Sequence, residues 1–241
     1  MRRFESCRPS HSRLPASLFS SLMRVGITLV ALAIASPTTL LAKAEPPVVR
    51  VRIETSAGNI TVALDARRAP RTTANFLAYV DDGRFDGTTF YRAARRKSAP
   101  GYGLIQGGID TNARRSLPPV AHEPTSLTGI RHLDATISMA RGGKPGTAMG
   151  NFFITVGPIQ SMDARGAYPG YAAFGTVSGG MGVVKKILAM PTGGGTGPMR
   201  GQMLQPPVRI IRAVRLDGVA KPTGVPKPWL LDAPWRKAKR R

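Results

Sequence analysis

Short strand-like runs recur along this chain, and glycine, proline or a polar cluster ends each of them. Residues 48–54 alternate with a period of two, residues 56–59 interrupt the pattern, and Ile60, Val62 and Leu64 resume it. A period of two places successive side chains on opposite faces of a strand, so these residues predict a β-hairpin. Glycine (27) and proline (21) make up about a fifth of the 241 residues, which favours short elements joined by turns.

Further short strand-like runs follow, and two segments carry a helical pattern instead. The strand-like runs are residues 88–92, 103–106, 136–140, 151–156, 172–177 and 208–216. Residues 70–82 place apolar side chains at helical spacing before Gly83, and residues 181–190 precede Pro191, so we expect two helices. Many short strands with only two helices predict a mainly β fold, a closed antiparallel barrel.

Residues 1–44 have the layout of a secretory signal peptide. Residues 25–36 form an uncharged, mostly apolar run behind a basic flank, and the small residues in 42–44 suit cleavage before Glu45. The run is too short to span a bilayer comfortably, so we expect export to the periplasm, with an uncleaved anchor as the alternative. Because Met23 and an arginine stand directly before the run, we expect translation to start at Met23.

Positive charge dominates the chain, whose formal net charge at pH 7 is +22. The charge is spread over arginine-rich patches and a basic, proline-rich tail, residues 218–241, that we expect to be disordered. Such a surface attracts anionic surfaces without specificity. Because no nucleic-acid motif accompanies it, we expect no specific nucleic-acid partner. Residues 45–217 remain as one folded domain.

Cysteine and histidine are too scarce for thiol or metal chemistry. The single cysteine, Cys7, lies in the predicted signal peptide, so the mature chain has no thiol for a disulfide. His122, Glu123 and His132 are too few and too irregularly spaced for a zinc site, and we interpret them as surface or local hydrogen-bonding residues. We therefore expect no metal and no cofactor.

Five sequence segments occur in the order and approximate spacing of one known domain. They are residues 90–92 (FYR), 104–108 (LIQGG), 137–141 (ISMAR), 151–154 (NFFI) and 173–175 (AFG). Over roughly residues 48–216 the chain resembles a bacterial, exported cyclophilin-type peptidyl-prolyl cis-trans isomerase. The resemblance implies an eight-stranded antiparallel closed barrel capped by two α-helices, with a substrate groove on its outer face.

The resemblance also implies roles for individual residues. Arg92 would contact the prolyl amide, Gln106 would handle that amide, and Phe153 would form the floor of a pocket for the proline ring. The implied substrate-binding positions are Leu104, Met139, Ala140, Arg141, Asn151, Met162 and Tyr171. The partners implied are proline-containing polypeptides, and we expect a monomer.

These residue types suit the chemistry of an X-Pro bond. When the bond twists, conjugation is lost and the prolyl nitrogen becomes a hydrogen-bond acceptor, to which a guanidinium such as Arg92 can donate. Phe152 and Phe153 are neighbours in a predicted strand, so only one of them can line the groove while the other lies in the core.

The chain also departs from the family pattern. The stretch between Arg92 and Gln106 is longer than in typical cyclophilins, and we expect its piece around residues 95–103 to bulge out beside the groove. A non-catalytic module or chaperone that binds proline-containing segments is the main alternative function. A binder of anionic surfaces or nucleic acid is the third, and only charge supports it.

Overall fold

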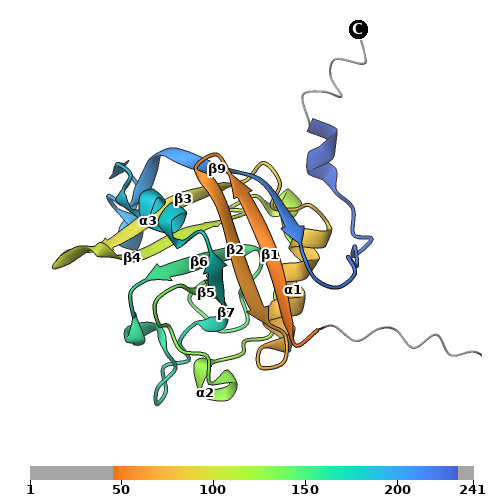
Figure 1. Cartoon of the computed structure of the whole chain (residues 1–241), viewed down its shortest axis with the longest axis horizontal. Helices are drawn as coiled ribbons and strands as arrows, with labels where there is room; N and C mark the ends of the chain where they lie inside the picture. Colours follow the sequence, from red (N-terminus) through yellow and green to blue (C-terminus); the bar gives the residue numbers. More distant parts are fainter. Residues whose placement is uncertain (1–45, 233–241) are drawn as a thin grey trace, which may run out of the picture. The chain divides into compact units, whose positions relative to one another are not determined.

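The computed structural model describes residues 46–232 and shows strands that wrap into a closed antiparallel barrel (Figure 1). Its sheet has the order β1-β2-β7-β5-β6-β4-β3-β9, and β1 also pairs with β9, which closes the barrel. These strands are β1 (Val48–Thr55), β2 (Gly58–Asp65), β3 (Thr89–Arg96), β4 (Ala99–Gly108), β5 (Thr136–Met139), β6 (Asn151–Val156), β7 (Ala172–Gly179) and β9 (Met203–Arg215). The predicted eight-stranded barrel is confirmed, and β8 (Thr192–Gly193) adds a short pairing to β9.

Helices α1 (Pro70–Asp81) and α3 (Met181–Ala189) match the two predicted helices, and α2 (Thr125–Thr128) is an additional single turn. Pro70 occupies the start of α1, where its fixed φ suits a helix. The Glu123 carboxylate accepts hydrogen bonds from the N–H groups of Arg71 at 3.1 Å and Thr72 at 2.7 Å, which a helix start leaves without partners. Glu123 is therefore buried rather than exposed.

The barrel interior is filled by the apolar residues that the alternation predicts. Val49, Val51 and Ile53 of β1 are buried, whereas the residues between them are more exposed. An aromatic cluster follows, in which the ring of Phe76 lies 5.0 to 5.4 Å from those of its aromatic neighbours Phe85, Phe152 and Phe174. These offset and edge contacts are favourable aromatic geometries, and they join α1 to β6 and β7.

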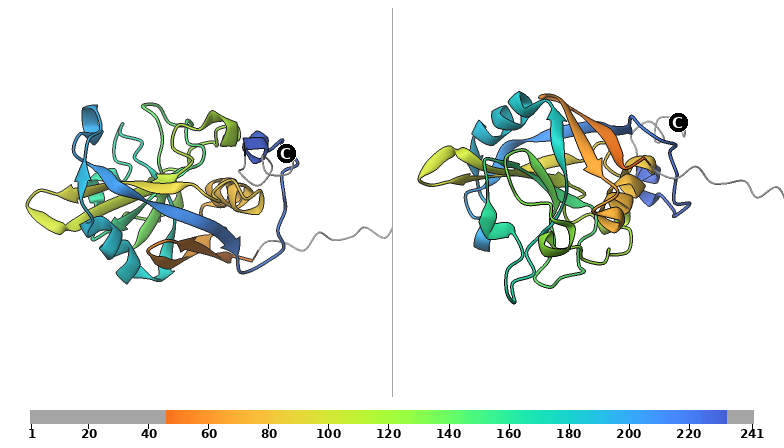
Figure 2. Two further views of the ribbon diagram at one scale, coloured as in Figure 1. Left: turned by 90° about the horizontal axis from the view of Figure 1, so that it is seen from above. Right: turned by 60° about the horizontal axis from the view of Figure 1, so that its bottom comes forward.

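The segment expected to bulge beside the groove forms regular structure. β3 and β4 run beyond their predicted ends and pair as a two-stranded ribbon that projects from the barrel at the left of Figure 1 and of both views in Figure 2. Gly103 permits this pairing, because a Cβ there would lie 2.1 Å from the carbonyl oxygen of Ala94. We call residues 94–104 the β3–β4 ribbon.

Residues 218–232, expected as part of a disordered tail, fold back onto the barrel instead. The backbone N–H of Lys221 donates to Asp81 at 2.9 Å, and Thr223 donates to Asp82 through its N–H at 2.8 Å and its hydroxyl at 2.6 Å.

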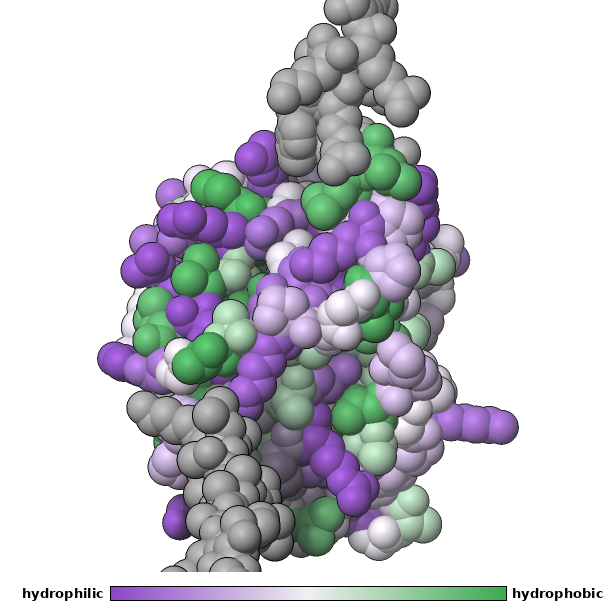
Figure 3. Space-filling model, turned by 90° about the vertical axis from the view of Figure 1, so that its right-hand side faces the viewer, coloured by the Kyte–Doolittle hydropathy of each residue, from purple (hydrophilic) through white to green (hydrophobic). Residues whose placement is uncertain are grey.

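On the side of the molecule shown in Figure 3, hydrophilic and hydrophobic side chains are interspersed. The predicted signal peptide and residues 233–241 lie outside the described residues.

A buried arginine explains why these residues dock. Arg84 is fully buried and its Nε donates to Asp82 at 2.7 Å. Its Nη2 donates to the carbonyl of Val225 at 3.2 Å, and Trp229 lies over its guanidinium with the centroid 4.8 Å away. Arg115 lies 5.0 Å from the same ring. A buried charge needs such partners, and the C-terminal segment supplies several of them.

We predict that Trp229→Ala lowers the free energy of unfolding by about 3 kcal/mol, because a buried aromatic ring and its cation–π contacts are lost. Urea titration measures this change. Leu231→Ala is the control, since Leu231 belongs to the same 3₁₀ turn, η4 (Pro228–Asp232), but is 62% exposed. If Trp229→Ala lowers the free energy of unfolding no more than Leu231→Ala does, docking of the Trp229 ring does not stabilise the barrel.

Candidate active site

Three strands bring the predicted catalytic residues into one row on the outer face of the barrel. Arg92 of β3 pairs with Gln106 of β4, and Gln106 pairs with Phe153 of β6. The Arg92 Nη1 donates to the Gln106 Oε1 at 2.8 Å. Residues paired across neighbouring strands share one face of the sheet, so the guanidinium, the amide and the ring lie side by side.

Hydrogen bonds hold this row in place at both ends. The Gln106 Nε2 donates to the Tyr91 hydroxyl at 2.8 Å, which directs the amide oxygen of Gln106 toward Arg92. On the other side, the Arg92 Nε donates to the Gln202 Oε1 at 2.9 Å, and the Gln202 Nε2 donates to the carbonyl of Pro198 at 3.1 Å. Sequence reasoning missed Gln202, which lies in a glycine-rich stretch far from Arg92 in the chain and carries no motif.

The row is partly withdrawn from water. Burial lowers the pKa of Arg92, against the opposing influence of Tyr91 and Tyr171, yet an arginine side chain keeps its proton in proteins. Burial also raises the pKa of Tyr91 to about 12, so its phenol is neutral at pH 7. Around Arg92 the structure therefore places neutral hydrogen-bonding groups, and the guanidinium carries the charge of the row.

Phe153 forms the floor of an apolar area beside Arg92. Its ring stacks on His132, with centroids 5.8 Å apart and an interplanar angle of 15°, and meets the edge of Tyr171 at 5.6 Å. Phe153, Leu104 and Tyr91 are buried yet stand apart from the barrel core, whereas Phe152 belongs to that core. The two adjacent phenylalanines thus point to opposite faces, as the alternation predicts.

His132 supports this floor from beneath. It is fully buried, its Nδ1 lies 2.7 Å from Asp163 Oδ1, and its Nε2 lies 2.9 Å from the Ser138 hydroxyl. The backbone N–H of His132 also donates to Asp163 at 2.9 Å. The expected local hydrogen bonding is present, but the residue is interior rather than on the surface, and no sequence motif indicates that its ring stacks on Phe153.

The predicted groove edge lies on the Tyr171 side of this floor. The guanidinium of Arg141 lies over the ring of Tyr171, 4.8 Å from its centroid, and its Nε donates to the carbonyl of Gly170 at 3.0 Å. The N–H of Ala140 donates to the carbonyl of Asn151 at 2.9 Å. These residues are half-buried and form the rim of the apolar area.

Asn151 and Met162 have local contacts of their own. The Asn151 side chain binds both the N–H and the carbonyl of Asp110, each at 2.8 Å, so its amide is already engaged. Met162 ends the 3₁₀ turn η2 (Gln160–Met162) and is half-buried, and its carbonyl accepts from the N–H of Tyr171 at 3.0 Å. The latter contact ties the turn to the rim.

Met139 does not line the outer face. It is 1% exposed, belongs to the barrel core, and pairs with Phe152 and Ala172. Its neighbour Ser138 pairs with Phe153 and points to the outer side. Since successive strand residues face opposite sides, Met139 supports the sheet from within and is corrected from a substrate contact to a core residue.

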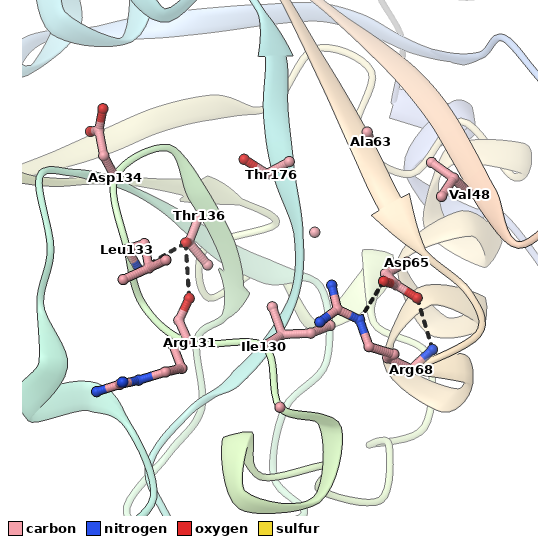
Figure 4. Close-up of a pocket in the computed structure, with 12 residues that line it drawn as sticks. Val48, Ala63, Asp65, Arg68, Ile130, Arg131, Leu133, Asp134, Thr136 and Thr176 are labelled. Atoms are coloured by element: carbon pink, nitrogen blue, oxygen red, sulfur yellow. Dashed lines mark hydrogen bonds and ion pairs between the residues drawn. The ribbon is translucent and has the colours of Figure 1, made fainter.

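A separate hollow in the described part of the chain involves other elements. It encloses about 430 Å³ among β2, β7 and the loop 129–136 (Figure 4). Within it, Arg68 forms an ion pair with Asp65 at 2.6 Å, and Thr136 bonds the backbone of Arg131 and Leu133. Residues 46–232 contain no group of three or more His, Cys, Asp or Glu side chains placed to hold a metal ion.

Comparisons with known proteins agree with this geometry. Residues 50–215 match the family model described as "Cyclophilin type peptidyl-prolyl cis-trans isomerase/CLD". The chain is 40% identical over 145 residues to peptidyl-prolyl cis-trans isomerase A of Dickeya dadantii, covering 59% of this chain and 72% of that protein. It is 31% identical over 170 residues to peptidyl-prolyl cis-trans isomerase ppi1 of Schizosaccharomyces pombe, covering 69% and 98%.

A solved structure shows the same fold. A cyclophilin type peptidyl-prolyl cis-trans isomerase of Cryptosporidium parvum superposes with a TM-score of 0.54 at 21% identity, covering 71% of this chain and 99% of that one. At this identity the likeness concerns the barrel itself.

We predict that the protein loses stability as the pH falls below about 6.5. Burial lowers the pKa of His132 below its ordinary 6.5, although Asp163 partly opposes this. The unfolded chain therefore binds a proton that the folded chain refuses, and below pH 6.5 the free energy of unfolding decreases by up to about 1.4 kcal/mol per pH unit. Urea titrations at pH 7.5 and 5.5 measure this slope.

The matched control is His132→Asn, which removes the titrating ring and should flatten the slope. NMR of the His132 imidazole gives an independent readout, and it should report a pKa below the ordinary 6.5. An imidazole that takes up its proton at or above pH 6.5 would contradict the prediction.

Proposed function

The chain belongs to the cyclophilin-type peptidyl-prolyl cis-trans isomerase family, and we propose that the row Arg92, Gln106 and Phe153 carries its isomerase activity on exported polypeptides. The observation that carries this proposal is the hydrogen bond from Arg92 to Gln106 directly beside the apolar floor of Phe153. The cationic donor Arg92 is therefore held next to the Phe153 ring, an apolar surface on which a proline ring can lie.

The reaction needs stabilisation of a twisted amide. An X-Pro bond has partial double-bond character and a rotation barrier of about 18–20 kcal/mol. At the top of the barrier conjugation is lost, and the lone pair of the prolyl nitrogen becomes available. A donor that binds this nitrogen only in the twisted state lowers the barrier without stabilising the planar ground state.

Arg92 is suited to be that donor. Within residues 46–232 its hydrogen bonds run from Nε to Gln202 and from Nη1 to Gln106, so Nη2 remains available for the prolyl nitrogen. Because both contacts hold the guanidinium in one plane, little reorganisation is needed as the bond twists. No bond to the substrate is made or broken apart from hydrogen bonds.

The apolar floor would hold the proline ring while the acyl side rotates. Phe153 offers a ring face fixed by His132 and Tyr171, and Leu104 and Met162 add apolar surface nearby. Ala140, Arg141 and Asn151 would contact the substrate backbone along the rim. The carbonyl of Asn151 and the amide of its side chain already have partners, so this rim is rigid before substrate arrives.

Export and a periplasmic location form part of the same proposal. The apolar run 25–36, its basic flank and the small residues in 42–44 support it. None of the helices within residues 46–232 is long and apolar enough to cross a membrane. The net charge of +22 supports a non-specific attraction to anionic surfaces alongside the isomerase role.

We predict that Arg92→Ala lowers kcat/KM for a short X-Pro peptide by about a hundredfold or more, as expected for the loss of one donor to the transition state. Exchange NMR of the peptide with the chain from Glu45 onward measures the rate. Arg209→Ala, which removes an exposed arginine of β9, is the control and should retain full activity.

Two outcomes would contradict this assignment. Unchanged exchange in Arg92→Ala would remove Arg92 from the catalytic role. Peptide binding without faster exchange in the parent protein would favour the non-catalytic module that binds proline-containing segments.

We also predict that the chain expressed from Met23 in a Gram-negative bacterium is recovered from the periplasm with Glu45 as its first residue. N-terminal sequencing of the periplasmic fraction gives the readout. Ala44→Arg should block processing because the cleavage site needs small residues, whereas Thr39→Ser should leave it unchanged. A soluble product that retains Met23 in the cytoplasm would refute export.

A further inference from the structure

The β3–β4 ribbon continues the face that carries Arg92. Along β3, Ala94 pairs with Leu104 as Arg92 pairs with Gln106, and the register then shifts between Arg95 and Arg96. The Arg96 guanidinium lies against Tyr102, which alternates with Leu104 and Gln106 along β4, so it is on the side of the sheet that bears the row of Arg92, Gln106 and Phe153. At about 3.3 Å per residue it is roughly 13 Å from Arg92 along the strand.

The Arg96 side chain is held in a defined position. Its Nη2 donates to the carbonyl of Pro158 at 2.8 Å, and its guanidinium carbon lies 5.9 Å from the centroid of Tyr102. The Tyr102 ring in turn rests on Gly157, where a Cβ would lie 2.0 Å from the ring. A charged group fixed in this way loses little freedom when it binds a ligand.

The charge of this surface is not neutralised. Arg96 and Lys97 are exposed, and no carboxylate in residues 46–232 lies within ion-pair distance of either. A neighbouring hollow of about 420 Å³ contains both Lys185 and Asp134, so it does not select one sign of charge. The ribbon itself selects negatively charged groups, because it presents Arg96 and Lys97.

From these observations, and resting on the isomerase function proposed above, we infer that the ribbon is a secondary substrate site for an acidic side chain. An aspartate or glutamate about three residues from the proline of an extended polypeptide reaches Arg96 and Lys97 while the proline lies on Phe153. The substrate class is thus polypeptides in which an X-Pro bond stands near an acidic residue. A guanidinium suits a carboxylate because it offers two parallel N–H donors.

The test compares three X-Pro peptides of equal length that carry glutamate three residues after the proline, glutamate three residues before it, or alanine at both places. Exchange NMR gives the isomerisation rate, and titration of chemical shifts gives Kd for each peptide. The parent chain is compared with Arg96→Gln/Lys97→Gln, and with Arg67→Gln/Arg71→Gln as a control that removes the same charge from the exposed start of α1.

We expect one glutamate peptide to bind the parent about three- to fivefold more tightly than the alanine peptide at low salt, and 0.5 M NaCl to abolish this difference. The ribbon variant should lose the preference while isomerising the alanine peptide at the parental rate, and the control variant should keep it. Equal Kd values for all three peptides, or a preference that survives in the ribbon variant, would overturn the inference.

The two proposals fail separately in this design. A glutamate preference in Kd without faster exchange would sustain the ribbon site and refute the catalytic assignment. Fast exchange without any glutamate preference in Kd would sustain the catalytic assignment and refute the ribbon site.

Discussion

The pairing of β1 with β9 closes the barrel, and this closure is the constraint on which the rest of the structure depends. In a closed sheet each strand residue faces either the interior or the outside. The interior is filled by apolar side chains, among them Phe76 and Phe152. The proposed site lies on the outer wall, where strand register aligns Arg92, Gln106 and Phe153 on a rigid support.

Local pattern was enough to predict the barrel and to single out the central residues of the proposed site. The two-residue period gives the strands and separates Phe152 from Phe153, because alternation depends only on neighbours in the chain. The family motifs place Arg92 and Gln106. The same reasoning misses Gln202 and the support that His132 gives to Phe153, since both contacts join distant segments whose approach is decided by the closed barrel.

Composition was a poorer guide than pattern for two segments. The stretch around residues 95–103 is rich in arginine, glycine and proline, yet it pairs as a ribbon because β3 and β4 are already in register beneath it. Residues 218–232 are polar and proline-rich, yet they dock because Arg84 is buried and needs acceptors. Trp229, a large apolar residue in a basic tail, is the signal that could have indicated this docking.

Five arginines within residues 46–232 differ in the charge of their partners. Arg84 and Arg215, which secure the C-terminal segment and α1, bind carboxylates and are neutralised. Arg92, Arg96 and Arg141, which line the outer face, are held by neutral amide and carbonyl oxygens instead. A carboxylate partner would fix the geometry equally well, but it would cancel the field that a developing lone pair or an acidic side chain experiences. Neutral acceptors position these guanidinium groups without neutralising them, as the proposed roles of Arg92 and Arg96 require.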